Sequence, residues 1–229
     1  MTFQRRTAHA VIRLIRALRP QARIAVGGYD ASLAPHAYTD PALGVDVIVR
    51  GEGEVTFREV LRVIAGDDTH LTSIAGLMYR HESTIVETPS RPVSALSSTE
   101  GIIRPPNRSA RVLSGYTLLG RPVDVVETSR GCTFDCSFYS IIEMRGRNLH
   151  HFPVDRAVAD IADARARGAR CIFFVDDNIV LDVPRFEKIC RAIIANGLHD
   201  IDYVVQAMTA PLAKHGLRLA PLMRRAGFR

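Results

Sequence analysis

Apolar residues recur along the first half of the chain with spacings that predict helices and strands in alternation. A spacing of three or four residues predicts one helix over 11–18, ending before Pro20, and a second over 57–64. Short apolar runs at 23–26 and 45–49 indicate strands. Strands that alternate with helices favour a parallel sheet with right-handed crossovers, so an α/β fold is predicted here.

The second half of the chain repeats a strand followed by a helix three times. The predicted strands are 123–126, 170–175 and 201–205, and the helices follow at 154–167, from Asp182 to Gly197, and at 211–226. Between the halves, residues 76–79 and 84–88 predict a hairpin. Residues 90–121 are rich in Pro, Ser and Arg and lack periodicity, which is typical of a linker between domains.

Composition narrows the class of protein but does not specify its chemistry. The chain has 229 residues, 47% hydrophobic and 24% charged, enough for one large or two smaller domains. No apolar run of membrane-spanning length and no signal peptide is evident. The four cysteines do not form a disulfide pattern, which predicts a cytoplasmic protein. The net charge of +6 is dispersed over helix faces, so no nucleic-acid partner is expected.

The candidate chemistry lies in the loop after the strand at 123–126. In its sequence, E-T-S-R-G-C-T-F-D-C-S-F-Y-S, three residues separate Cys132 from Cys136, and two more separate Cys136 from Tyr139. A C-x3-C-x2-C loop after a first barrel strand is the iron–sulfur signature of the radical S-adenosylmethionine (radical SAM) superfamily. This stretch resembles that signature in all but its last position, where Tyr139 stands instead of a third cysteine.

The resemblance implies a cofactor and a set of ligands. In the family, three thiolates hold a 4Fe-4S cluster, and its open iron binds S-adenosylmethionine, which is cleaved to a radical on reduction. Cys132 and Cys136 would then be iron ligands, with Tyr139 at the third position. A phenolate is costly at neutral pH because the pKa of tyrosine is about 10. We therefore expect a weak, oxidisable or absent cluster. A small-molecule substrate and an electron donor are the implied partners.

The resemblance also implies residues that surround S-adenosylmethionine. Asp176, Asp177 and Asn178 follow the second barrel strand, and many cobalamin-linked members end this strand in the same three letters. Gln206 follows the third strand, and Phe138 would contact adenine. The alternative is that the polar residues after the second strand only cap the next helix.

The first half resembles the C-terminal part of the cobalamin-binding domain that precedes many radical SAM cores. It shares a strand, a Gly-Gly turn, a helix, a second strand, R-G-E-G-E and another helix. Carried over, Gly27 and Gly28 would lie near the nucleotide tail of cobalamin, although a plain turn is an equal alternative. The D-x-H-x-x-G ligand segment of some members is absent. The resemblance thus implies cobalamin as a possible cofactor, whose binding domain is incomplete in this chain.

Together these features predict an α/β protein: residues 1–89 as the C-terminal part of a Rossmann-like cobalamin-binding domain, 90–121 as a linker, and 122–229 as the first half of a radical SAM partial (β/α)6, TIM-like barrel. The chain is expected to be truncated at both ends of that architecture. The predicted activity is radical chemistry of the methyl-transfer or cyclisation type, without catalysis by this chain alone. Two alternatives remain: a non-catalytic remnant that binds no intact cluster, and a doubly wound domain whose two cysteines bind zinc with outside ligands.

Overall fold

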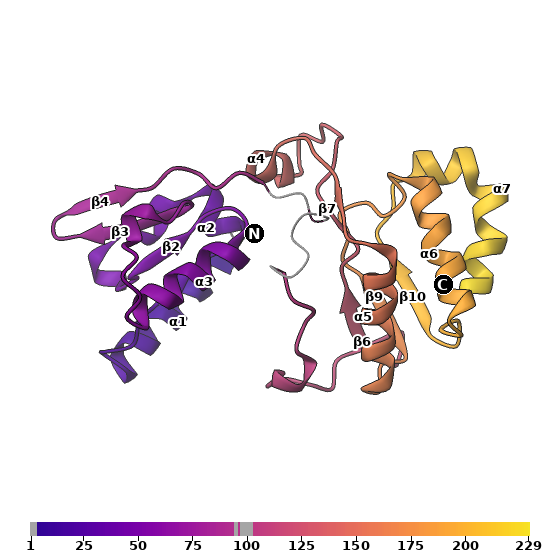
Figure 1. The fold of residues 1–229 in the computed structure, drawn as a ribbon, viewed down its shortest axis with the longest axis horizontal. Coiled ribbons are helices and arrows are strands. Elements are labelled where there is room, and N and C mark those ends of the chain that lie inside the picture. The colour runs from indigo at the N-terminus through magenta and orange to yellow at the C-terminus, as the bar shows by residue number, and fades with distance from the viewer. Residues whose placement is uncertain (1–3, 94–95, 97–102) are drawn as a thin grey trace. The chain divides into compact units, whose positions relative to one another are not determined.

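A computed structural model describes residues 4–93, 96 and 103–229 of the chain, and shows a mixed α/β fold (Figure 1). The chain divides into two compact units. Unit 1 comprises Met1–Ser94 with Glu143–Arg145, and unit 2 comprises Ala95–Ile142 with Gly146–Arg229. Within the described ranges, no helix combines the length and the apolar character that a membrane crossing requires.

Unit 1 contains a four-stranded sheet in the order β1-β2-β3-β4. Strand β1 (Ala25–Val26) runs parallel to β2 (Val47–Val49), as the strand–helix alternation predicts. The predicted hairpin is confirmed as β3 (Leu77–His81) and β4 (Thr84–Glu87). Because β3 joins β2 in the antiparallel direction, the sheet is mixed rather than wholly parallel.

Helices pack on both faces of this sheet because the side chains of β2 alternate between them. Ile48 joins a buried cluster with α1 (Arg5–Leu18) and α2 (Tyr29–Leu33). Val47 and Val49 join a second cluster with α3 (Gly53–Ile64). Short 3-10 turns complete the unit at Pro35–Tyr38, Pro41–Leu43 and Leu71–Ser73.

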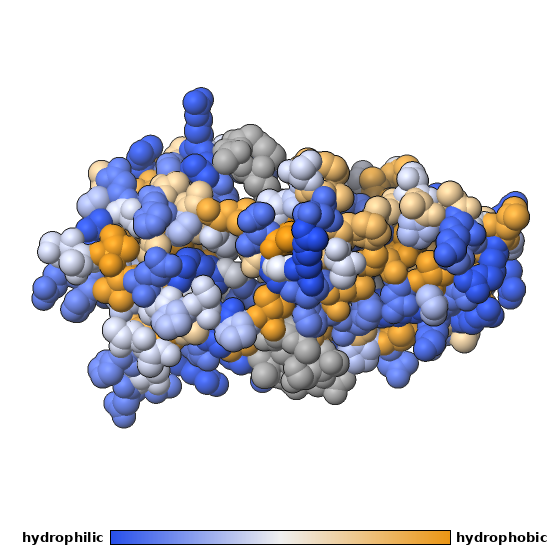
Figure 2. Space-filling model, turned by 90° about the horizontal axis from the view of Figure 1, so that it is seen from above, coloured by the Kyte–Doolittle hydropathy of each residue, from blue (hydrophilic) through white to orange (hydrophobic). Residues whose placement is uncertain are grey.

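The two predicted helices of unit 1 are confirmed, but of the residues on their predicted apolar faces only Val60 is buried in the core. In α1 the buried residue is Ile12, whereas Leu14 and Leu18 are 58% and 69% exposed. In α3 the buried residues are Thr56 and Val60, and Ile64 is 51% exposed. Hydrophobic residues therefore lie among hydrophilic ones on the protein surface, as Figure 2 shows for one face.

Unit 2 is built on a sheet in the order β10-β9-β6-β5. Strands β6 (Arg121–Val126), β9 (Cys171–Phe174) and β10 (Asp202–Val205) are parallel, and β5 (Thr117–Leu118) pairs antiparallel with β6. The helices are α5 (Val154–Ala166), α6 (Val183–Ala195) and α7 (Thr209–Ala226). The three predicted strand–helix units are thus present.

The core of unit 2 is aromatic at its centre. Phe174, Tyr203 and Phe228 pack against one another, and their ring centroids lie 5.3 to 6.0 Å apart. Cys171 and Cys190 are fully buried in this unit, and both are free cysteines. Burial raises the pKa of the Cys190 thiol to about 12, so it stays protonated and unreactive at neutral pH.

Short elements lie between β6 and α5. Helix α4 (Ile141–Arg145) follows the cysteine loop. Strands β7 (Ser129–Arg130) and β8 (His150–His151) pair antiparallel and bring together the two ends of the segment 129–151. Two-residue strands leave no periodic signal, so no pattern in the sequence indicates this pairing.

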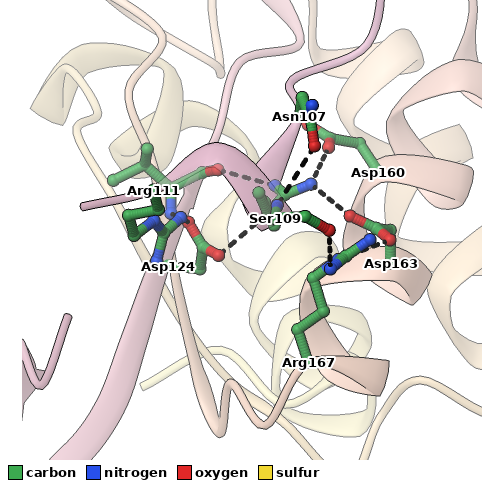
Figure 3. A network of polar contacts seen from close by, with 9 residues as sticks. Asn107, Ser109, Arg111, Asp124, Asp160, Asp163 and Arg167 are labelled. Carbon is green, nitrogen blue, oxygen red and sulfur yellow. Dashed lines mark hydrogen bonds and ion pairs between the residues drawn. The ribbon is translucent and has the colours of Figure 1, made fainter. Parts of the chain in front are cut away.

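The segment predicted as a linker over 90–121 is partly built into unit 2, although its residues 94–95 and 97–102 lie outside the described part. Arg108, in the short 3-10 turn Arg108–Ala110, has a side chain only 4% exposed. It forms ion pairs with Asp124 on β6 and with Asp160 and Asp163 on α5 (Figure 3). This turn is therefore anchored to the sheet and to a helix.

Candidate functional site

The predicted site residues of unit 2 all follow strand ends at one edge of its sheet. In the parallel register, Val126 of β6 and Val205 of β10 both pair with Phe174 of β9. The loop after Val126, the acidic residues after β9 and Gln206 after β10 therefore leave the sheet at the same edge. Parallel β/α barrels build their sites at this C-terminal edge.

Asp176 fixes the first residues of the cysteine loop. Its carboxylate accepts hydrogen bonds from the backbone nitrogen of Thr128 (2.8 Å), from the Thr128 hydroxyl (2.6 Å) and from the Ser129 hydroxyl. The residue is 1% exposed, and burial raises its pKa despite these hydrogen bonds. Both carboxylate oxygens are thus occupied inside the protein, so Asp176 positions the loop.

Asp177 contacts both ends of the cysteine loop. It accepts a hydrogen bond from the backbone nitrogen of Gly131 at 2.8 Å and another from the Tyr139 hydroxyl. Gly131 has a φ of +93°, and a Cβ built there would overlap the carbonyl oxygen of Asn148. Glycine is therefore required at the point where the loop begins.

The two cysteines differ in exposure. Cys132 is 6% exposed, Cys136 is intermediate, and both thiols are free. Tyr139, which follows Cys136 in a turn closed by its own N–H (3.0 Å to the Cys136 carbonyl), is 37% exposed, and Phe138 is 88% exposed. Across 4–93, 96 and 103–229, no cluster of three or more His, Cys, Asp or Glu is arranged to hold a metal.

The other two predicted residues, Asn178 and Gln206, follow the ends of β9 and β10. Asn178 is 3% exposed, and its Oδ1 accepts a hydrogen bond from the backbone nitrogen of Met208 at 3.2 Å. This contact links the end of β9 to the segment after β10. Gln206, the first residue after β10, is exposed to solvent.

The predicted Gly-Gly turn belongs to unit 1. Gly27 and Gly28 connect β1 to α2. Gly28 has a φ of +88°, which favours glycine, and the space where its Cβ would stand is empty to 4 Å. At Gly27 a Cβ would only touch Val49, at 3.5 Å. The turn thus demands glycine at Gly28 and leaves open space beside it.

Sequence reasoning missed Arg185 on α6. The residue is 9% exposed, and its side chain donates to the Thr128 hydroxyl (3.0 Å), to the Thr128 carbonyl (2.8 Å) and to the Phe152 carbonyl (2.9 Å). A signal was available, because Arg185 lies four residues before Ile189 and so shares the buried face of its helix. An arginine at such a position indicates a buried polar partner.

Comparisons with known proteins found a matching family and several proteins of similar sequence. The B12 binding domain family matches residues 1–61. An uncharacterized methyltransferase of Pyrococcus horikoshii is 28% identical over 201 residues, covering 87% of this chain and 43% of that protein. The anaerobic magnesium-protoporphyrin IX monomethyl ester cyclase of Cereibacter sphaeroides is 28% identical over 188 residues, covering 79% and 30% respectively. The chain is a relative of the cobalamin-associated radical SAM proteins.

Solved structures of two such radical SAM proteins share the fold. The methyltransferase TsrM from Kitasatospora setae, with cobalamin and a [4Fe-4S] cluster bound, superposes with a TM-score of 0.75 over 99% of this chain and 44% of its own, at 19% identity. OxsB, with aqua-cobalamin and S-adenosylmethionine bound, gives 0.66 over 87% and 28%, at 18% identity. The chain spans less than half the length of the methyltransferase and of the cyclase that it matches in sequence. The resemblance predicted from the sequence is therefore confirmed.

The cysteine loop differs from the three-thiolate set of this family. Two thiols and a phenol are present at the signature positions, and the phenol donates a hydrogen bond to Asp177. Fe–S clusters are normally held by cysteine thiolates. These residues do not fit a cluster held by three thiolates.

Proposed function

We propose that the chain contributes to radical SAM chemistry of the methyl-transfer or cyclisation type on a small-molecule substrate. Residues 1–89 would be the C-terminal part of a cobalamin-binding-like α/β domain, and 122–229 the first half of the radical SAM barrel after the linker at 90–121. The methyltransferase and cyclase relatives support the reaction type. An electron donor and a cytoplasmic location belong to the same proposal.

One observation carries this proposal: two neighbouring carboxylates hold the cysteine loop at the C-terminal edge of a parallel sheet. Asp176 binds Thr128 and Ser129, and Asp177 binds Gly131 at 2.8 Å. The backbone that presents the thiols is thus fixed by contacts from the next strand. A loop held in this way at this edge is suited to bind a cofactor.

The proposed cofactors are S-adenosylmethionine, a 4Fe-4S cluster and cobalamin. The exposed ring of Phe138 would stack on adenine, and Asp177, Asn178 and Gln206 would surround the rest of S-adenosylmethionine. Gly27 and Gly28 would lie against cobalamin, because the open space beside Gly28 admits a ligand. Asp176 would act only through the loop that it holds.

A second candidate function is a non-catalytic remnant that binds no intact cluster. The contact between the Tyr139 hydroxyl and Asp177 favours it. This hydrogen bond, with that of Gly131, connects both ends of the cysteine loop to one carboxylate. The side chain at the third ligand position is therefore hydrogen-bonded to Asp177.

Anaerobic reconstitution with ferrous iron and sulfide separates the two candidates. We would compare the wild-type chain with Tyr139→Cys, and use Tyr116→Cys as a matched control because Tyr116 is 59% exposed in unit 2 outside the loop. The cluster proposal expects bound iron to rise toward four atoms per chain in Tyr139→Cys alone. Equal iron in both variants would mean adventitious binding and would favour the remnant.

Binding of S-adenosylmethionine is measured separately by equilibrium dialysis of the same proteins. Phe138→Ala should weaken binding, because it removes the ring that would stack on adenine. The ring is 88% exposed, so its removal should not disturb the fold. Release of 5′-deoxyadenosine from reconstituted Tyr139→Cys under reducing conditions would establish the radical reaction. Binding that is the same in the wild type and in Phe138→Ala would remove Phe138 from the site.

A further inference from the structure

The cysteines stand on an excursion of the chain that leaves and rejoins unit 2 at a narrow neck. The excursion starts after Thr128 and ends before Phe152. At the neck, the N–H of Phe152 donates to the carbonyl of Thr128 at 2.9 Å, and β7 pairs with β8 in the residues that follow and precede it. The path of the excursion thus depends on how these two backbone segments are held together.

Arg185 binds both sides of this neck with one guanidinium group. Its Nη2 donates to the carbonyls of Thr128 (2.8 Å) and Phe152 (2.9 Å), and its Nη1 donates to the Thr128 hydroxyl (3.0 Å). The planar fork of arginine suits three acceptors in such an arrangement, whereas lysine presents a compact ammonium. The neck is therefore closed by side-chain hydrogen bonds in addition to its backbone pairing.

Thr128 also connects Arg185 to a buried carboxylate. The Thr128 hydroxyl accepts from Arg185 and donates to the buried carboxylate of Asp176 at 2.6 Å. The backbone of Arg185 is itself fixed, since its N–H donates to Asp182 at the start of α6 at 3.0 Å. The backbone of Arg185 is thus fixed at the start of α6, and its guanidinium is linked to a buried carboxylate through the Thr128 hydroxyl.

We propose that Arg185 is a positioning residue that closes the neck of the excursion 129–151 and so determines where Cys132 and Cys136 stand. It acts through Thr128 and Phe152. That this placement serves cofactor binding rests on the proposed function, whereas closure of the neck does not.

Hydrogen–deuterium exchange of the full chain tests the closure without any cofactor. Arg185→Met should raise the exchange rate of amides in 129–151 roughly tenfold or more, while amides of β9 keep the wild-type rate. Arg185→Lys should fall between the two, because an ammonium cannot reproduce the fork. Arg191→Met, an exposed position on the same helix, is the matched control. Unchanged exchange in 129–151, or an equal rise throughout unit 2, would overturn the proposal.

A milder variant covers the case in which Arg185→Met does not fold. Thr128→Val removes the hydroxyl that joins Arg185 to Asp176 but keeps the carbonyl that Arg185 also binds. Its exchange should rise in 129–151 by less than that of Arg185→Lys and stay local. Wild-type exchange in both Thr128→Val and Arg185→Lys would refute the role.

Iron uptake then tests the link to the cofactor in a Tyr139→Cys background. Adding Arg185→Met should reduce bound iron per chain to about half or less, while Arg191→Met leaves it unchanged. If Tyr139→Cys itself binds no iron, the proposed function fails, and the exchange experiment still decides the role of Arg185. If iron uptake is the same with and without Arg185→Met, the neck does not control the cysteines.

Discussion

Replacing Arg108 by Met removes the only group in the described part of unit 2 that joins β6, α5 and the turn before them through one side chain. The guanidinium is 4% exposed and lies 2.8 Å from Asp124 and 2.5 Å from Asp160. Asp124 is 6% exposed, so the substitution leaves a carboxylate with little access to water. Breaking a buried ion pair by removing one partner typically costs about 3–5 kcal/mol.

The low end of that range is expected for Arg108→Met. Arg111, which is 38% exposed, keeps its contact with Asp124 at 2.7 Å and partly neutralises the remaining charge. A loss of about 3 kcal/mol should lower the urea midpoint of unit 2 by at least about 1 M, given the usual dependence of unfolding free energy on urea. Circular dichroism during urea unfolding measures it.

Two controls make the result specific to burial. Arg167→Met removes an exposed partner of Asp163 in the same network and should leave the midpoint close to that of the wild type. Combining Arg108→Met with Asp124→Asn should recover part of the lost stability, because no charge is then buried without its partner. Equal midpoints for Arg108→Met and Arg167→Met would refute the reasoning.

Three further predictions concern the same unit. Burial raises the pKa of Asp124, but hydrogen bonds from Arg111 and Val125 and the charge of Arg108 outweigh burial and bring the pKa below its usual value. The ionised carboxylate therefore stabilises the fold fully above about pH 4, and this stabilisation is lost as pH falls through the lowered pKa. Asp124→Asn should make the free energy of unfolding less dependent on pH in the acid range. Gly131→Ala should displace the cysteine loop, since the added Cβ would overlap the carbonyl oxygen of Asn148. Proteolysis within 129–151 should then be faster, while the melting temperature of unit 2 stays the same. An unchanged rate of proteolysis would contradict this prediction. Tyr139→Phe should release one end of the loop from Asp177 and increase exchange over 136–139, whereas Tyr116→Phe should not.

The sequence by itself determined the elements and the position of the loop. The apolar runs at 123–126, 170–175 and 201–205 predicted three strands that the structure contains, and the spacing in 57–64 predicted a helix that it confirms. Periodicity succeeds here because each element must bury one face, and a buried face leaves a repeating mark on the sequence. The resemblance in 127–140 located the candidate site for the same local reason, since its signature lies within one loop.

Only the tertiary structure decided the polar partners. Asp176 binds Thr128 across 48 residues, and Arg185 binds the same residue across 57. The antiparallel placement of β3 and the burial of Arg108 within a segment predicted as a linker also arise from such distant contacts. A buried charge requires a partner but carries no periodicity, and packing alone selects that partner among the many polar residues of the chain.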